Sequence, residues 1–129
     1  MMRLVFDTYA WIEYLIGSPI GKRVETYLED KDNEIFTPSI VLLELSCKAA
    51  KEKWDFKNIS DFIKMHSRAI GLGEEVIEKC GVLYTDLKKK NKRFGLVDAV
   101  IFTTSLRLDA KVLTGDEHFR GLKNAIMLK

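Results

Sequence analysis

The sequence has few cysteines and no long hydrophobic run, and each shortage argues against a class of protein. Its two cysteines, Cys47 and Cys80, form no C-x-x-C motif and lie in apolar helical patterns, so we expect both to be buried thiols. No segment approaches the roughly 18 apolar residues of a membrane-spanning helix. The N-terminal stretch MMRLVFD also has too short an apolar region for a signal peptide. These shortages favour a soluble, cytoplasmic protein with no membrane partner.

The balance of charge and hydrophobicity is that of a globular protein. Hydrophobic residues make up 47% of the 129 residues and charged residues 31%, which is enough apolar material for one sizeable core. The sequence has only two prolines and eight glycines, so a long linker is not expected. The formal net charge of +2 is too small to indicate a nucleic-acid-binding protein by itself. We therefore expect a single domain over residues 1–129.

Short apolar runs alternate along the chain with segments of helical periodicity. Strands are predicted at residues 4–6, 34–37, 111–114 and 125–128, with a more ambiguous one at 69–72. Helices are predicted from residue 8 to a stop at Gly17, from residue 19, from residue 39, and at residues 56–69, 74–91 and 96–108. This alternation predicts an α/β fold, with three α/β/α layers around a mainly parallel central sheet of four to five strands.

Four acidic residues lie where such a sheet would bring them together. Asp7 ends the first strand, and Asp116 follows the KVLT strand by two residues. Asp98 lies in the first turn of its helix, and Glu44 lies a little over one turn into the helix of SIVLLELSCK. Ligands of parallel sheets bind outside the carboxyl ends of the strands. The four carboxylates are therefore predicted to converge at that edge.

Each acid also has a purely structural explanation. Asp7 and Asp116 could cap the helical turns that follow them, and Asp98 could favour the positive end of its helix dipole. Glu44 lies among apolar residues, where a partly buried salt bridge to a lysine is the simplest alternative. What favours a binding site is the joint placement of the four acids.

Convergent carboxylates favour a bound cation. Their mutual repulsion is relieved by a positive ion, and a set of oxygen ligands favours Mg²⁺ or Mn²⁺ over zinc. Such an ion lowers the pKa of a bound water and stabilises negative charge on a phosphoryl oxygen. The chemistry that fits these residues is hydrolysis of a phosphodiester bond.

Four segments that carry these acids resemble the motif regions of PIN-domain ribonucleases: FDTYAWIEYL, PSIVLLELSCKA, GLVDAVIFTTSLRL and KVLTGDEHF. Within that family the chain is most similar to the VapC-type toxins of toxin–antitoxin pairs, and the similarity spans nearly the whole chain. It implies a PIN-like three-layer fold and Mg²⁺- or Mn²⁺-dependent endonucleolytic cleavage of RNA. It also implies a homodimer and a cognate antitoxin that blocks the acidic groove.

The resemblance assigns roles to individual residues. It implies that four carboxylates bind the metal, directly or through water: Asp7, Glu44, Asp98 and Asp116. Thr114 matches a catalytic hydroxyl position beside the fourth acid, and Thr8 matches a hydroxyl position beside the first. Both threonines are expected to orient the site. No acid of the pattern is missing, so nothing in the resemblance indicates an inactive member of the family.

A basic run before the helix of Asp98 could guide RNA to an acidic pocket that would otherwise repel it. Its members are Lys88, Lys89, Lys90, Lys92 and Arg93. Cations at the end of a helix also complement the helix dipole, so the run has a structural explanation as well.

The two histidines are not expected to be catalytic. His118, in DEHF, is expected to pack or hydrogen-bond beside the site, where Phe119 anchors the turn in the core. His66 falls on an apolar helix face and is expected to be a core histidine. A metal-free ribonuclease that uses two histidines remains an alternative.

Three further functions compete with this interpretation. A haloacid-dehalogenase-type phosphatase needs a second aspartate two residues after the first, where this chain has Tyr9. A receiver-like signalling module needs an acid pair at the first strand and a late lysine, but Asp7 is alone and the KVLT strand ends in Thr114. A non-catalytic PIN-like module that binds RNA or a partner remains open.

Overall fold

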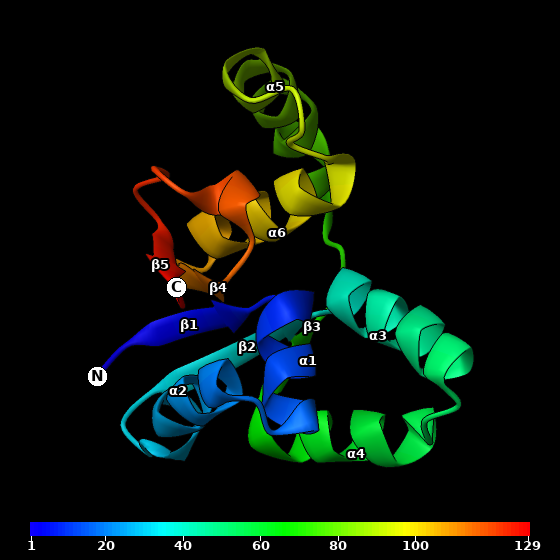
Figure 1. Cartoon of the computed structure of the whole chain (residues 1–129). Coiled ribbons are helices and arrows are strands. Elements are labelled where there is room, and N and C mark those ends of the chain that lie inside the picture. The colour runs from blue at the N-terminus through cyan, green and yellow to red at the C-terminus, as the bar shows by residue number, and fades with distance from the viewer.

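A sheet of five parallel strands forms the centre of the molecule, in a computed structural model that describes residues 1–129 (Figure 1). The strands lie in the order β3 (Arg68–Ile70), β2 (Glu34–Pro38), β1 (Arg3–Phe6), β4 (Lys111–Thr114) and β5 (Ala125–Met127). All four pairings are parallel. The predicted sheet is confirmed, and it is parallel throughout.

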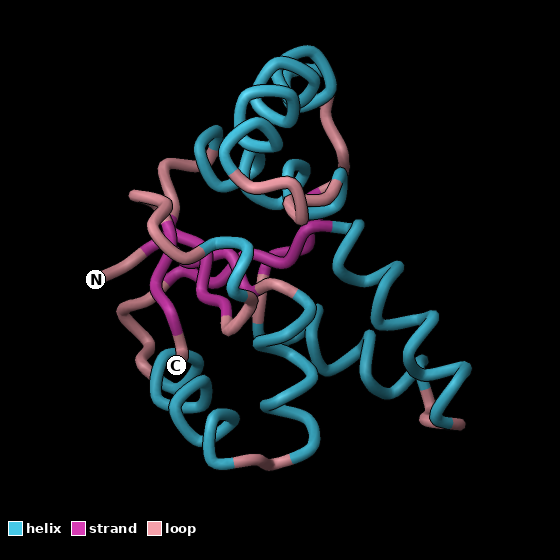
Figure 2. The backbone as a smooth tube through the Cα atoms, turned by 45° about the horizontal axis from the view of Figure 1, so that its top comes forward, coloured by secondary structure: helices cyan, strands magenta, loops and turns pink.

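Six helices cover the sheet on both sides and complete three α/β/α layers (Figures 1 and 2). In Figure 1, three helices lie below the strands: α1 (Thr8–Ile16), α2 (Pro19–Glu29) and α4 (Phe56–His66). Two lie above, α5 (Glu74–Lys90) and α6 (Leu96–Arg107), while α3 (Ser39–Glu52) contacts both α1 and α6. None of the helices has the length and apolar character needed to cross a bilayer.

The turn between α1 and α2 is set by three consecutive residues. Gly17 ends α1 in the left-handed conformation, with φ of 70°, which costs glycine little. The Ser18 hydroxyl then accepts a hydrogen bond from a backbone N–H of α2, and Pro19 occupies the first helical position. These predicted stop and start signals are confirmed.

Three of the four residues of strand β1 are buried because helices cover both faces of the sheet. Leu4, Val5 and Phe6 have no exposed surface. The ring of Trp11 in α1 packs on Phe6 with centroids 5.0 Å apart, and its indole N–H donates to the hydroxyl of Thr37 in β2. This packing holds Asp7, the residue that follows β1, on a rigid support.

The α4–β3 region differs from the predicted helix 56–69 and strand 69–72. The helix ends at His66, because Ser67 is extended and its hydroxyl donates to a backbone carbonyl of the last helical turn. Strand β3 then begins at Arg68 and pairs with β2. It is short and largely exposed, so it lacks the apolar run that marks the other strands.

Two residues that were predicted to be buried are exposed. Cys47 is exposed on α3, whereas Cys80 is buried as predicted. His66 is exposed at the end of α4, where its ring stacks on Phe62 with centroids 4.1 Å apart. Both predictions were wrong because helical periodicity identifies an apolar face but not how far neighbouring elements cover it.

Candidate active site

Three of the four predicted acids meet at the carboxyl edge of the sheet. Asp7 directly follows β1, and Asp116 follows β4 by two residues. The register of β1 against β4 sets Asp7 beside Thr114. Asp98 reaches the same edge from the first turn of α6. Residues far apart in sequence are therefore brought to one point by the parallel arrangement of the strands.

Asp7 is the most buried of these acids, with 3% of its surface exposed. It caps α1, since its Oδ1 accepts the N–H of Ala10 at 2.8 Å. Burial raises the pKa of the Asp7 carboxyl to about 7. Hydrogen bonds from Thr114 and Ala10 oppose that rise in pKa, and the charges of Asp116 and Asp98 add to it. A cation bound here would favour the ionised form of Asp7.

Asp98 and Asp116 are linked by His118. The imidazole Nδ1 lies 2.9 Å from Asp98 Oδ2 and 3.4 Å from Asp116 Oδ1. The backbone N–H of His118 also donates to Asp116 Oδ1 at 2.9 Å, which caps the 3₁₀ turn η1 (Glu117–Phe119). Phe119 is buried against Phe94 and anchors this turn, as expected. The expected hydrogen-bonding role of His118 is observed, but the sequence did not indicate that Asp98 is its partner.

Glu44 is connected to this edge through Thr8. The Thr8 hydroxyl donates to Glu44 Oε1 at 2.5 Å. This hydrogen bond connects α3 to the first residue of α1, which directly follows Asp7. Glu44 is only half-buried and forms no ion pair, so the alternative of a salt bridge to a lysine is wrong. Glu44 and Asp7 lie outside the tighter group in which ligand atoms fall within 4.8 Å of one another, namely Asp98, Asp116 and His118.

Three of the four carboxylates have one restrained oxygen and one available oxygen. A backbone N–H restrains each aspartate, and the Thr8 hydroxyl restrains Glu44. The second oxygens of Asp98, Asp116 and Glu44 accept no hydrogen bond from the protein. Carboxylates oriented in this way and left with free lone pairs are suited to bind a divalent cation. The donor set therefore fits Mg²⁺ or Mn²⁺.

The sequence matches the family model of the PIN domain over residues 4–124, a region that includes all four acids. The chain belongs to the PIN-domain family. PIN domains are generally nucleases, and divalent metals are typical of them. No curated protein sequence matches the chain.

Solved structures with the same fold come from toxin–antitoxin systems. VapBC2 of Rickettsia felis, bound to promoter DNA, has a TM-score of 0.75 at 22% identity, and the match covers 98% of this chain and 97% of that one. DNA-bound VapBC of Salmonella typhimurium has a TM-score of 0.77 at 16% identity, covering both chains fully, at 100%. VapC20 of Mycobacterium tuberculosis, a toxin that cleaves the sarcin–ricin loop, has a TM-score of 0.73 at 15% identity, covering 94% and 95%.

The predicted basic run lies at the end of α5 and in the turn that leads to α6. Lys88 has a structural role in this PIN domain, because its ammonium donates to the carbonyls of Lys92 and Phe94 at 3.0 and 3.3 Å. Lys89, Lys90, Lys92 and Arg93 are exposed. Lys88 is also exposed, but its ammonium is already hydrogen-bonded, so a role in binding RNA stays a prediction that fits the other four better.

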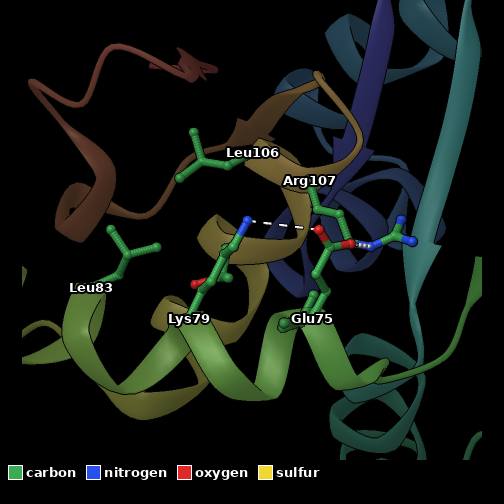
Figure 3. A pocket seen from close by; sticks show the side chains of 7 residues that line it. Glu75, Lys79, Leu83, Leu106 and Arg107 are labelled. Carbon is green, nitrogen blue, oxygen red and sulfur yellow. Dashed lines mark hydrogen bonds and ion pairs between the residues drawn. The ribbon is translucent and has the colours of Figure 1, made fainter.

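A separate cavity of about 190 Å³ lies between α5 and α6 (Figure 3). Its walls are largely apolar, with Leu83 and Leu106 among the lining residues. Its one carboxylate, Glu75, is already paired with Arg107 at 2.7 Å and Lys79 at 3.7 Å. This cavity contains none of the four acids and lacks an available carboxylate, so it is not the candidate active site.

Proposed function

We propose that the chain is a Mg²⁺- or Mn²⁺-dependent endoribonuclease and the toxin of a type II toxin–antitoxin pair. The observation that carries this proposal is the meeting of three restrained aspartates at one edge of the sheet. Two of them raise the pKa of Asp7, which is already raised by burial. Like-charge crowding of this kind destabilises the folded state, and a bound cation would relieve it.

The residues of the chain would hold the reacting groups in fixed positions. A divalent ion at this edge would acidify a water molecule and offset the negative charge on a phosphoryl oxygen. Four carboxylates would hold the ion: Asp7, Glu44, Asp98 and Asp116. Each of the three aspartates is fixed by the backbone N–H of a nearby residue. Thr8 would hold Glu44 in place, and Thr114 would restrain Asp7. Preorganisation of this kind lowers the free-energy cost of assembling the reactants.

The proposed substrate and partners are supported by the structural neighbours. VapC20 of Mycobacterium tuberculosis acts on an RNA loop, which supports RNA as the substrate class. The Rickettsia felis and Salmonella typhimurium structures are complexes of a toxin with its antitoxin. We therefore propose a cognate antitoxin for this chain, a homodimer, and action on cellular RNA in the cytoplasm.

An RNA-cleavage assay on purified protein tests this function. Wild type and Asp98→Asn are purified in parallel and compared in Mg²⁺, Mn²⁺ and EDTA, so that a contaminating ribonuclease would appear in both preparations. We expect cleavage by the wild type alone, in the presence of metal. The asparagine retains an oxygen that can accept the Gly95 N–H, so loss of activity would reflect the lost charge rather than a lost cap.

The alternative is a non-catalytic module that binds RNA or a partner. One observation favours it, since Asp7, Asp98 and Asp116 each satisfy a backbone N–H at the start of a helix or turn. In that case the three acids are caps. No cleavage of any RNA, together with no binding of Mg²⁺ or Mn²⁺, would support this alternative.

A further inference from the structure

His118 lies among the carboxylates in a position that the proposed function does not use. Its side chain is 32% exposed, and its Nδ1 faces one oxygen of Asp98 and one oxygen of Asp116. The other histidine, His66, is bonded through Nδ1 to a carbonyl of its own helix and contacts none of these acids. His118 is therefore the one imidazole available to this site.

The spacing of these three ligand atoms resembles that of neighbouring ligands around one ion. Two ligands at right angles, each about 2.1 Å from a divalent ion, lie about 3 Å apart. The Nδ1 of His118 is 2.9 Å from Asp98 Oδ2 and 3.4 Å from Asp116 Oδ1. All three atoms fall within 4.8 Å of one another. In the structure the contact between Nδ1 and Asp98 Oδ2 is a hydrogen bond, so an ion would have to replace the proton between them. With Nδ1 unprotonated, small side-chain movements would place the three atoms around a single ion.

We propose that His118 is a nitrogen ligand of the metal site, beside Asp98 and Asp116. Imidazole favours transition metals, whereas Mg²⁺ prefers oxygen ligands. The mixed nitrogen and oxygen donors would therefore select Mn²⁺ over Mg²⁺ more strongly than carboxylates alone. This inference rests on the proposed function, because it assigns a further ligand and a metal preference to the same site.

The competing role for His118 is that of a hydrogen-bond donor that only positions Asp98. Asparagine separates the two roles, because its amide can replace the donor near Nδ1 but supplies no imidazole nitrogen. A positioning residue would affect the binding of Mg²⁺ and Mn²⁺ equally. A nitrogen ligand would affect Mn²⁺ far more than Mg²⁺.

The test measures metal binding by the protein without RNA. Wild type, His118→Asn and the control His66→Asn are loaded with Mn²⁺, and pulsed electron paramagnetic resonance reports whether a nitrogen nucleus is bonded to the ion. Because the chain has only two histidines, the assignment is unambiguous. We expect the nitrogen signal in the wild type and in His66→Asn, and its loss in His118→Asn.

Calorimetric titrations of the same three proteins give the metal preference. In His118→Asn the affinity for Mn²⁺ should fall by at least about tenfold while the affinity for Mg²⁺ changes by less than about threefold. A wild type that binds Mn²⁺ without a nitrogen signal would overturn the proposal. Equal losses of both affinities would also overturn it, because they would identify a positioning residue.

Failure of the proposed function gives a different result. A nitrogen signal in a protein that cleaves no RNA would support His118 as a ligand and argue against the nuclease. Metal-dependent cleavage without a nitrogen signal would support the nuclease and overturn the role of His118. A wild type that binds no divalent ion would overturn both.

Discussion

Asp7 shows how one side chain can serve both the fold and the site. One of its oxygens caps α1, a task that asparagine performs equally well. Its negative charge is costly at a position that is 3% exposed, and the cost of burial outweighs the stabilisation by the hydrogen bonds from Thr114 and Ala10. Substituting asparagine therefore separates the destabilising effect of the buried charge from the stabilising effect of the helix cap.

Asp7→Asn should stabilise the metal-free protein at alkaline pH. The folded state keeps a proton on Asp7 up to about pH 7, whereas the unfolded state loses it near the ordinary value of 3.8, so stability falls as pH rises between these values. We expect the variant to be more stable than the wild type by roughly 2–4 kcal/mol near pH 8, with little difference near pH 4. Urea denaturation in EDTA at several pH values measures this difference. A wild type that gains stability over Asp7→Asn as pH rises would contradict it.

The hydroxyl of Thr8 should matter because it holds Glu44. Thr8→Val removes the donor at nearly constant volume, and we expect RNA cleavage to slow by about 10- to 100-fold, as for other groups that orient a metal ligand. Thr8→Ser keeps the hydroxyl and should retain most activity. Glu44→Gln should lose at least as much as Thr8→Val, because the amide carries no charge. Initial rates in Mn²⁺ check this series, and equal rates for all variants would show that Glu44 is not part of the site.

For single residues, the sequence predicted where a side chain lies in the fold better than which side chain it contacts. Asp7 and Asp116 could be placed at strand ends because they directly follow short apolar runs. The contact between His118 and Asp98 could not be predicted, since it joins a turn to a helix that starts 22 residues earlier in sequence, at Leu96. The exposure of Cys47 likewise depends on which elements cover α3, and local periodicity carries no information on this.

Among the elements, the α1–α2 hairpin depends on a close approach of the two helices at Gly21. A Cβ atom there would lie 2.1 Å from the backbone oxygen of Glu13 and 2.7 Å from its carbonyl carbon. Backbone atoms cannot rotate away as a side chain can, so any larger residue would force α1 and α2 apart. Helix α1 begins at Thr8 and is capped by Asp7, which links this packing to the site.

Gly21→Ala should therefore destabilise the protein, by about 2–3 kcal/mol for overpacking of this kind. Gly81→Ala is a matched control within α5, where an added Cβ meets no atom within 4 Å. Because alanine favours helices, the control should gain about 0.5–1 kcal/mol. Urea denaturation of both variants measures the two effects, and changes of the same sign would contradict the packing described here.

Most element boundaries could be predicted from sequence because strong local signals mark them. Gly17, Ser18 and Pro19 mark the turn between α1 and α2 directly. The end of α4 was missed, because Ser67 breaks the helix through a hydrogen bond to its own last turn rather than through proline or glycine. Strand β3 was placed too late in the chain, because an exposed edge strand shows no apolar pattern.

At the scale of the whole molecule, the charge is close to balanced but unevenly distributed. An acidic edge repels the phosphate backbone unless cations lie along the path of the RNA. The exposed residues at the end of α5 are placed before α6, which carries Asp98 in its first turn. Lys89 and Lys90 are the residues of the basic run at this helix end, apart from Lys88, whose ammonium is hydrogen-bonded to backbone carbonyls.

Lys89→Ala/Lys90→Ala should weaken RNA binding and reduce its dependence on salt. Each lost phosphate contact lowers the slope of log affinity against log salt by about 0.7 for single strands, so two contacts lower it by about 1.4. Binding is measured in the Asp98→Asn background to prevent cleavage. Lys57→Ala/Lys64→Ala, on α4, removes the same charge elsewhere and should leave the slope unchanged. An unchanged slope in the α5 variant would show that the run is a solvated helix end.

The layers and parallel strands could be predicted from the alternation of short strands with helices, but the order of the strands could not. The order β3-β2-β1-β4-β5 brings α1 against β4 and α6 against β1, and these segments lie 90 or more residues apart in sequence. This order is what places Asp7 beside Thr114. The convergence of the acids was therefore inferred from the general behaviour of parallel sheets rather than from any local signal.

The central claim is that the carboxylates at this edge direct water onto a phosphodiester bond with the help of a divalent ion. The measurement that tests it most directly is the chemistry of the RNA ends left by the wild type in Mn²⁺. The account predicts a 5′-phosphate and a 3′-hydroxyl, because water attacks phosphorus in line with the bond to the 3′ oxygen, which leaves and takes up a proton. Ends with 2′,3′-cyclic phosphate would contradict it, because they would show that the ribose hydroxyl attacks and that these acids do not hold a hydrolytic metal.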